Sequence, residues 1–505
     1  MRDNGVMLQA FEWDLKDSGT HWNDIKALSG QLRSLGFTAV WLPPAQKCNA
    51  GIHDVGYGVY DLYDLGEFNQ KNTVRTKYGT AAQYLAAIKS LKAHHIMPIA
   101  DIVLNHRMGA DTKETATCQP VNPDNRAEKD GSPLTGDVYT GFTFPGRNGK
   151  YSKFKWDAHC FTGVDTVVLH PEEGKSEVRN GVYLLNGKDF AQDVSAEKGN
   201  FDYLMGANVD MSCKDVQREL THWGFWFVRK TGIEGFRLDA CKHISREFMK
   251  NWLDVQREHS GKELFSVGEY WSNNLSDLQQ YIADVDRKTS LFDVCLHYHF
   301  QELGNANGNY DLRALFSGTL VNADPQLAVT FVDNHDTQPG QALESWIPVW
   351  LKAPAYALIL LRDCGFPCVF WGDLYGIPAK NIGRVSELPT LLHLRDEAAR
   401  GPEHDYFDEE HLLGFTREGE DDAPGSGLAM LFSCRDAGEK RMFVSSRLAG
   451  QTLVCRMGHG APVKLDSEGC GTFRVDAGQF CVYTPKRSLF HALCWQVRRI
   501  LRRFI

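Results

Sequence analysis

Ionisable and polar side chains stand at the ends of four of the short apolar runs in this 505-residue chain. Such runs are typical of strands, and the side chains at the ends of parallel strands in a barrel meet at one mouth. Grouped by run, the residues are Asp101, Asn105 and His106; Arg237 and Asp239; Glu269; and Asp333, His335 and Asp336. Together they would bring acids, an arginine and two imidazoles to one place.

Paired carboxylates at strand ends suit the cleavage of a glycosidic bond. One carboxylic acid protonates the leaving oxygen, and in a retaining mechanism a second carboxylate about 5–5.5 Å away is the nucleophile. Arg237 precedes Asp239 by two residues, so both side chains point to the same side of a strand, and this pairing should keep Asp239 ionised. Glu269 is flanked by Tyr270 and Trp271, and partial burial would raise its pKa as a general acid requires.

Each of these residues alone is weak evidence for catalysis. A single aspartate at a strand end is more often a helix cap or a salt-bridge partner than a nucleophile, and a single arginine beside it is usually a structural ion pair. The joint pattern, in this strand order, is what indicates a catalytic site.

Eight apolar runs rich in β-forming residues supply the expected strands. Continuous apolar runs, rather than alternation, predict a parallel sheet that is buried on both faces. The runs span residues 6–11, 38–44, 96–106, 235–240, 264–271, 290–296, 328–336 and 367–373. Apolar residues at helical spacing over 21–35 and 214–230, and a helix capped by Thr80, alternate with them. The pattern favours an α/β fold with a (β/α)8 TIM barrel, and a doubly wound open sheet is the alternative.

Two regions depart from this alternation of strands and helices. Between His106 and about Cys213 the chain is rich in Gly, Asp, Asn and Thr, and it predicts an inserted irregular β subdomain after strand 3, because structureless loops of that length are uncommon. After about residue 400, short alternating segments predict a C-terminal antiparallel β domain. The expected domains are a barrel over 1–106 plus 214–399, an insert over 107–213, the C-terminal β domain over 400–485 and a tail over 486–505.

The tail over 486–505 carries one lysine and five arginines but no acid, and its apolar residues fall at helical spacing. This basic amphipathic pattern predicts a helix that either packs on the body of the protein or touches a membrane surface.

Bulk composition excludes several classes of protein. The net charge of −9 and the absence of a long basic stripe in the main body argue against a nucleic-acid partner. No stretch of about 18 apolar residues predicts a transmembrane segment, and the N-terminal residues MRDNGVMLQAFEWD lack the apolar core of a signal peptide. The 13 cysteines form no CxxC pair, and several lie in apolar runs, which favours buried reduced thiols over a disulfide framework. A cytoplasmic location is therefore expected.

Four segments resemble the conserved regions of the α-amylase family of retaining glycoside hydrolases. They are DIVLNH (101–106), GFRLDACKH (235–243), GEYW (268–271) and FVDNHD (331–336). Further segments resemble the subgroup of bacterial liquefying and intracellular fungal α-amylases, namely residues 56–80, 154–157, 200–211, 335–345, 404–408 and 414–419. The resemblance covers the chain from about residue 5 to residue 485, which leaves only the tail outside it.

The resemblance implies a role for each matching residue. Asp239 corresponds to the nucleophile, Glu269 to the general acid and base, and Asp336 to the third carboxylate, which holds sugar hydroxyls. The matching substrate-binding residues are Arg237, His106, His335, Tyr57 and Lys242. The implied substrate is starch, glycogen or a maltodextrin, cleaved internally at α-1,4 bonds.

The resemblance also implies one structural calcium ion between the barrel and the insert. The matching ligands are Asn105, Asp202, Asn208 and the backbone carbonyl of His243, all of them oxygen donors, which calcium prefers. Asn208 stands where the bacterial relatives have an aspartate, and the loss of an anionic ligand should weaken the site. The additional metal cluster of the subgroup is not expected, because Thr162 and Ala191 stand where it needs acids.

Two other functions are compatible with these residues. A transglycosylase such as a 4-α-glucanotransferase uses the same three carboxylates and passes the sugar to another glucan instead of water. A non-catalytic glucan-binding protein on the same barrel is disfavoured by the presence of Asp239, Glu269 and Asp336. The chain departs from the family between residues 372 and 407, where the aromatic-rich linker is reduced. This difference concerns the sugar-binding subsites distant from the cleaved bond and not the catalytic residues.

Overall fold

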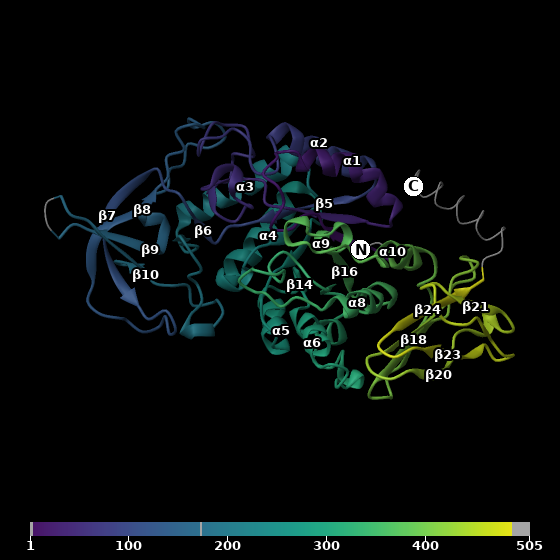
Figure 1. The fold of residues 1–505 in the computed structure, drawn as a ribbon. Coiled ribbons are helices and arrows are strands. Elements are labelled where there is room, and N and C mark those ends of the chain that lie inside the picture. Colours follow the sequence, from purple (N-terminus) through teal and green to yellow (C-terminus); the bar gives the residue numbers. More distant parts are fainter. Residues whose placement is uncertain (1–3, 172–173, 487–505) are drawn as a thin grey trace.

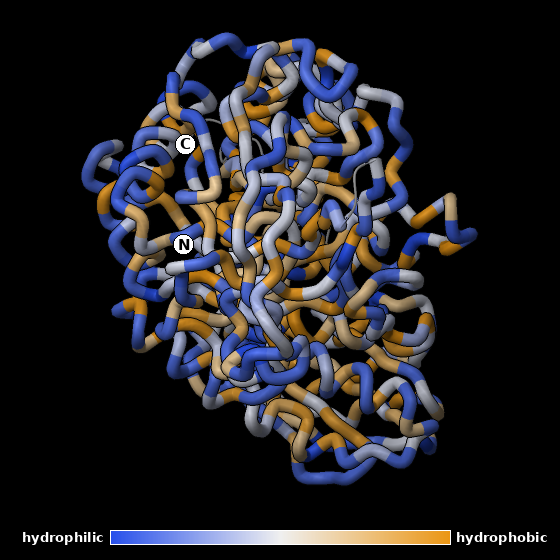
Figure 2. Tube along the Cα trace, turned by 90° about the vertical axis from the view of Figure 1, so that its left-hand side faces the viewer, coloured by the Kyte–Doolittle hydropathy of each residue, from blue (hydrophilic) through white to orange (hydrophobic). Residues whose placement is uncertain are grey.

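The computed structural model describes residues 4–171 and 174–486 of the chain. A barrel forms the centre of the molecule, the insert projects from one side of it, and the C-terminal β domain lies on the opposite side (Figure 1). Hydrophilic segments lie mainly at the periphery (Figure 2). The tail predicted as a basic amphipathic helix lies outside the described residues except for Lys486.

Eight parallel strands close the central barrel, because β1 pairs with both β16 and β2. The barrel strands are β1 (Met7–Gln9), β2 (Ala39–Leu42), β5 (Met97–Ile102), β12 (Gly235–Leu238), β13 (Phe265–Gly268), β14 (Ser290–Phe292), β15 (Ala328–Phe331) and β16 (Phe366–Phe370). Each lies within, or one residue beyond, one of the eight predicted runs. The closed order confirms the TIM barrel and excludes the open sheet.

Helices follow the barrel strands and lie outside them (Figure 1). They are α1 (His21–Ser34), α2 (Ala81–Ala93), α3 (Lys214–Thr231), α4 (Arg246–Ser260), α5 (Leu275–Asp284), α6 (Val294–Asn305), α7 (Leu320–Ala323), α8 (Val349–Leu361), α9 (Trp371–Tyr375) and α10 (Leu388–Glu397). The cap predicted at Thr80 is confirmed. Its hydroxyl accepts a hydrogen bond from the Gln83 N–H, and the Gln83 side chain accepts one from the Thr80 N–H, a capping box that fixes the start of α2.

Two predicted strands run into the helix that follows them. The run over 290–296 is a strand only as far as Phe292, because the Asp293 carboxylate accepts a hydrogen bond from the Leu296 N–H and caps α6. The run over 367–373 is a strand only as far as Phe370, where α9 begins. Apolar content alone does not separate a buried strand from the buried helix that follows it.

The insert is built around a six-stranded sheet with antiparallel pairing. Its strands are β6 (His106–Arg107), β7 (Thr112–Val121), β8 (Leu134–Gly141), β9 (Phe161–Leu169), β10 (Glu177–Leu185) and β11 (Ala207–Val209). His106 pairs here with Asn208, although it follows barrel strand β5 by only a few residues. The sheet therefore reaches directly to the mouth of the barrel.

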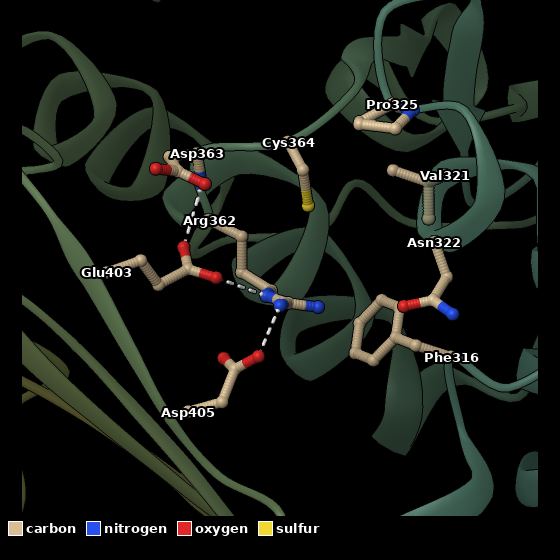
Figure 3. A pocket seen from close by; sticks show the side chains of 9 residues that line it. All are labelled: Phe316, Val321, Asn322, Pro325, Arg362, Asp363, Cys364, Glu403 and Asp405. Carbon is tan, nitrogen blue, oxygen red and sulfur yellow. Dashed lines mark hydrogen bonds and ion pairs between the residues drawn. The ribbon is translucent and has the colours of Figure 1, made fainter.

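The C-terminal domain combines a six-stranded antiparallel sheet with the strand pair β20 and β23. Its strands are β17 (Glu403–Tyr406), β18 (Leu412–Arg417), β19 (Leu428–Ser433), β20 (Gly438–Phe443), β21 (Thr452–Cys455), β22 (Val463–Lys464), β23 (Cys470–Val475) and β24 (Phe480–Pro485). Figure 3 shows how the domain joins the barrel: Arg362 donates to Glu403 and Asp405 of β17, each at 2.8 Å. The residues around this contact line a pocket, and several of them stand just before the start of β16 in the chain. The pocket therefore lies at the end of the barrel opposite to the one that carries the ionisable residues.

None of the twelve cysteines among the described residues forms a disulfide, and nine of them are buried. In the same part of the chain, no helix is both long and apolar enough to cross a membrane.

Candidate active site

Arg237 on β12 joins three carboxylates at the mouth of the barrel. Its Nη1 donates to Asp101 Oδ1 at 2.9 Å and to Asp239 Oδ1 at 2.5 Å, and its Nη2 donates to Glu269 Oε2 at 2.8 Å. The strand register explains this geometry, because Arg237 pairs with Asp101 on β5 and with Val267 on β13. Asp239 and Glu269 follow the ends of their strands and meet the guanidinium from two sides.

Burial governs the charge state of these carboxyls. It raises the pKa of Asp239 from 3.8 to about 6, and the Arg237 charge opposes the rise. Asp239 is therefore mainly ionised at pH 7, as its pairing with the arginine predicts. Burial also raises the pKa of Glu269, again against Arg237 and with the Asp239 charge adding to the rise. This is the direction that a proton donor requires.

Each of the two carboxylates keeps one oxygen uncommitted. Among the described residues, only Arg237 donates to Asp239, and it does so at Oδ1. Glu269 Oε2 accepts from Arg237 and from the Ala240 N–H at 2.9 Å, while the described residues donate no hydrogen bond to Oε1. One oxygen of each group is fixed in place and the other is left for a reacting molecule.

Asp336 follows β15 and completes the acidic cluster. It forms no ion pair with Arg237 among the described residues, and its Oδ2 lies 3.3 Å from His335 Nε2. Burial, and next to it the charge of Glu269, raises the pKa of Asp336 well above 3.8. Asp333, also at this strand end, turns away from the site and accepts from the Lys352 ammonium at 2.6 Å and the Thr337 hydroxyl at 2.7 Å. It anchors the loop that carries Asp336.

Aromatic rings and imidazoles form one wall of the site. The Tyr57 ring stacks on His335 with a centroid distance of 5.2 Å and an interplanar angle of 17°. The Tyr57 hydroxyl donates to Asp101 Oδ2 at 3.0 Å, which fixes the ring. His106 Nε2 lies 2.7 Å from the Tyr57 carbonyl oxygen, and burial lowers the pKa of His106 to about 4. In this structure, neutral His106 therefore supports the Tyr57 backbone.

Lys242 links the insert to the barrel at the edge of the site. Its ammonium donates to Glu197 Oε2 at 2.7 Å and to the Trp271 carbonyl at 3.0 Å. Trp271 is two residues after Glu269, so the Lys242 ammonium is a cation at the edge of the carboxylate cluster.

Asp101 is a strand-end acid to which the sequence pattern assigns no role. The structure makes it the anchor of the site, because Arg237, Tyr57 and Trp41 all donate to it. Its position opposite Arg237 is set by the strand register, so the sequence alone does not reveal this role.

The four predicted calcium ligands come together where the insert meets the barrel. Asn105 Nδ2 donates to the carbonyls of Asp202 at 3.3 Å and His243 at 3.1 Å. Asn208 Nδ2 donates to Asp202 Oδ2 and to Thr162 Oγ1, both at 2.7 Å. Asn208 Oδ1 is buried and accepts no hydrogen bond in the structure. Two side-chain amides thus occupy a pocket lined by oxygen atoms.

A closed (β/α)8 barrel whose mouth holds carboxylates on adjacent strands, bridged by an arginine, defines the class of barrel glycosidases. No family model matches the chain. It is 45% identical over 496 residues to "Alpha-amylase" of Geobacillus stearothermophilus, which covers 98% of this chain and 89% of the relative. It is 40% identical over 492 residues to "Cytoplasmic alpha-amylase" of Escherichia coli, which covers 95% of this chain and 98% of the relative. The chain belongs to the α-amylase family.

Solved structures agree with this fold. An Anoxybacillus α-amylase has a TM-score of 0.63 at 16% identity and covers 96% of this chain and 99% of its own. A Geobacillus thermoleovorans α-amylase in complex with acarbose has a TM-score of 0.61 at 17% identity and covers 96% and 98%.

Replacing Asp239 by asparagine is expected to stabilise the fold at pH 7. An aspartate whose pKa is about 6 in the folded state and 3.8 when unfolded makes stability fall as pH rises between these values. The variant lacks this penalty, so its free energy of unfolding should exceed that of the wild type by about 1–3 kcal/mol at pH 7, with little difference at pH 4.

Denaturant unfolding at both pH values measures this difference, and Asp421→Asn, at a side chain that is 95% exposed, is the matched control. A destabilised Asp239→Asn protein at pH 7 would show that the Arg237 pairing outweighs the cost of burial.

Proposed function

We propose that this protein is an α-amylase that hydrolyses internal α-1,4-glucosidic bonds of starch, glycogen or maltodextrins with retention of configuration. The observation that carries the proposal is the pair Asp239 and Glu269, buried on adjacent strands and bridged by Arg237. The names of the relatives support the same substrate class, since they include α-amylases and "Glucan 1,4-alpha-maltohexaosidase" of a Bacillus species, 44% identical over 487 residues.

In the first step, Asp239 Oδ2 attacks the anomeric carbon and Glu269 gives its proton to the leaving glycosidic oxygen. The glycosidic bond breaks as the bond to Asp239 forms. In the second step, ionised Glu269 takes a proton from water, which attacks the same carbon and releases Asp239. Arg237 holds the second oxygen of each carboxylate throughout, so neither group has to reorient between the steps.

The remaining residues bind the sugar at the bond to be cleaved. The raised pKa of Asp336 suits a group that shares hydrogen bonds with sugar hydroxyls, with His335 beside it. Tyr57 offers an aromatic face for stacking on the ring, and Lys242 contacts the leaving-group side. His106 contributes by holding the Tyr57 backbone, and it reaches the sugar only if it exchanges that contact for one with the substrate.

Product analysis on a maltooligosaccharide tests the reaction. The wild type should release short products that are initially in the α configuration, and Asp239→Asn and Glu269→Gln should each lower kcat by about 10⁴-fold, because each removes a group that forms or breaks bonds. Proton NMR of the anomeric signals measures both. Asp421→Asn should retain full activity.

Other outcomes of this experiment would point to other functions. Products longer than the substrate would identify a transglycosylase that uses the same carboxylates. Binding without any turnover that depends on Asp239 would identify a glucan-binding protein and overturn the proposal.

We propose one structural calcium ion at the junction of Asn105, Asp202, Asn208 and the His243 carbonyl. The donor set fits, because turning over the two side-chain amides presents their Oδ1 atoms beside the Asp202 carboxylate and the backbone carbonyls. The unpartnered Asn208 Oδ1 is available for this. When bound, calcium would tie the insert to the loops that follow β5 and β12.

Calcium is therefore expected to raise the melting temperature of the wild type, and a chelator to lower it. Asn208→Asp should bind calcium at least about tenfold more tightly, because affinity rises with the number of anionic ligands. The same variant should be less stable than the wild type in chelator, since it places a second carboxylate beside Asp202. Calorimetric titration measures the affinity.

Asn148→Asp, at an exposed position of the insert, is the control for added charge. Equal melting temperatures with and without calcium, in the wild type and in Asn208→Asp, would show that hydrogen bonds alone hold the junction.

We propose that the protein acts in the cytoplasm on internal glucans. The "Cytoplasmic alpha-amylase" of Escherichia coli and the unpaired cysteines of the described residues support this location. Fractionation of the source cells should recover the activity in the cytosolic fraction. Recovery outside the cell would contradict the proposal, and recovery on membranes that is lost when residues 487–505 are removed would assign the tail to a membrane surface.

A further inference from the structure

Gln9 is a buried polar residue of the barrel mouth that has no part in the bond-breaking steps. It is the last residue of β1, only 1% exposed, and lies opposite Trp41 and Phe370 in the strand register. Its side-chain Nε2 lies 2.9 Å from Nδ1 of His335. This contact joins a strand without catalytic groups to the imidazole beside Asp336.

Aromatic neighbours set the position of the His335 ring, but they do not determine which ring nitrogen carries the proton. Tyr57 and Trp13 stack nearly parallel to it, with interplanar angles of 17° and 13°, and Phe11 lies 4.9 Å away. Burial, together with the charge of Arg237, lowers the pKa of His335 well below 6.5, so the ring is neutral and carries one N–H. The polar groups next to its two nitrogens decide which nitrogen holds that proton.

An amide nitrogen can only donate, so His335 Nδ1 accepts from Gln9 and the ring proton sits on Nε2. Nε2 lies 3.3 Å from Asp336 Oδ2 but makes no hydrogen bond among the described residues, so its N–H is available to a sugar hydroxyl. The opposite tautomer would set a ring N–H against the amide hydrogens of Gln9, and that contact would be repulsive.

The orientation of the Gln9 amide follows from the same count of donors and acceptors. Its Oε1 is buried and has no partner among the described residues. Turning the amide over would pair Oε1 with a protonated Nδ1, but it would leave the amide N–H groups without acceptors. An unpaired buried N–H is rarer in proteins than an unpaired carbonyl oxygen, which favours the orientation in which Gln9 donates.

We propose that Gln9 is a positioning residue that fixes His335 in the tautomer with its proton on Nε2, the nitrogen beside Asp336, where it can donate to the sugar hydroxyls that Asp336 binds. The tautomer is argued from the Gln9 contact and the neutrality of the buried ring, whereas the effect on the sugar rests on the function proposed above. Gln9 acts through His335 and is not itself expected to touch the substrate.

Long-range ¹H–¹⁵N NMR of protein labelled at histidine nitrogen reads the tautomer directly, and His335→Gln assigns the signals. In the wild type, Nδ1 of His335 should show the shift of a bare nitrogen and Nε2 that of a protonated one. In its ionised form, the carboxylate of Gln9→Glu offers only acceptors, so it should place a proton on Nδ1. A wild-type spectrum with the proton on Nδ1 would overturn the proposal.

Kinetics on a maltooligosaccharide separate positioning from general damage. Gln9→Met keeps the length of the side chain but loses the donor, and it should lower kcat about tenfold, the effect of one hydrogen bond, with KM changed less than about twofold. Gln9→Glu should lower kcat further because it enforces the other tautomer. Gln119→Met on β7 of the insert should leave kcat unchanged.

A Gln9→Met protein with full kcat, or with a lower kcat while its His335 proton stays on Nε2 in the wild-type proportion, would contradict the proposal. If the protein cleaved no α-glucan, the nitrogen shifts would still report the tautomer, so failure of the proposed function is distinguishable from failure of this inference.

Discussion

The guanidinium of Arg237 is the interaction on which the rest of the site depends. Asp101, Asp239 and Glu269 are all buried against it, and without its charge their mutual repulsion and loss of hydration would leave them protonated. One arginine fixes one oxygen of each carboxylate, so the reactive oxygens are positioned by a single rigid group. Because arginine stays charged, this compensation does not vary over the physiological pH range.

The barrel makes such a cluster possible because parallel strands deliver their carboxyl ends to one mouth. Arg237 reaches its partners across immediate neighbours, with β5 on one side and β13 on the other. The insert extends this mouth, since its strand β6 begins at His106 and its pairing with Asn208 brings the oxygen-rich junction close to Tyr57. The catalytic residues and the insert therefore meet at the mouth of the barrel.

Local sequence patterns were enough to predict much of the architecture. Apolar runs located all eight barrel strands, and the Thr80 and Gln83 pair marked the start of α2, because these features depend on neighbours close in sequence. The predicted strand over 290–296 was wrong beyond Phe292, since burial produces the same apolar composition in a strand and in the helix after it. The two-residue spacing of Arg237 and Asp239 was enough to predict their ion pair.

The sequence by itself determined the fold class, the acids at the strand ends and the membership of a family, because strand periodicity and motif order are properties of the chain. Only the tertiary structure decided how these groups share charge and hydrogen bonds. Asp101 became an anchor, Asp333 turned toward Lys352, and His106 bound the Tyr57 backbone. Each outcome depends on partners distant in sequence, whose distances are set only when the barrel closes.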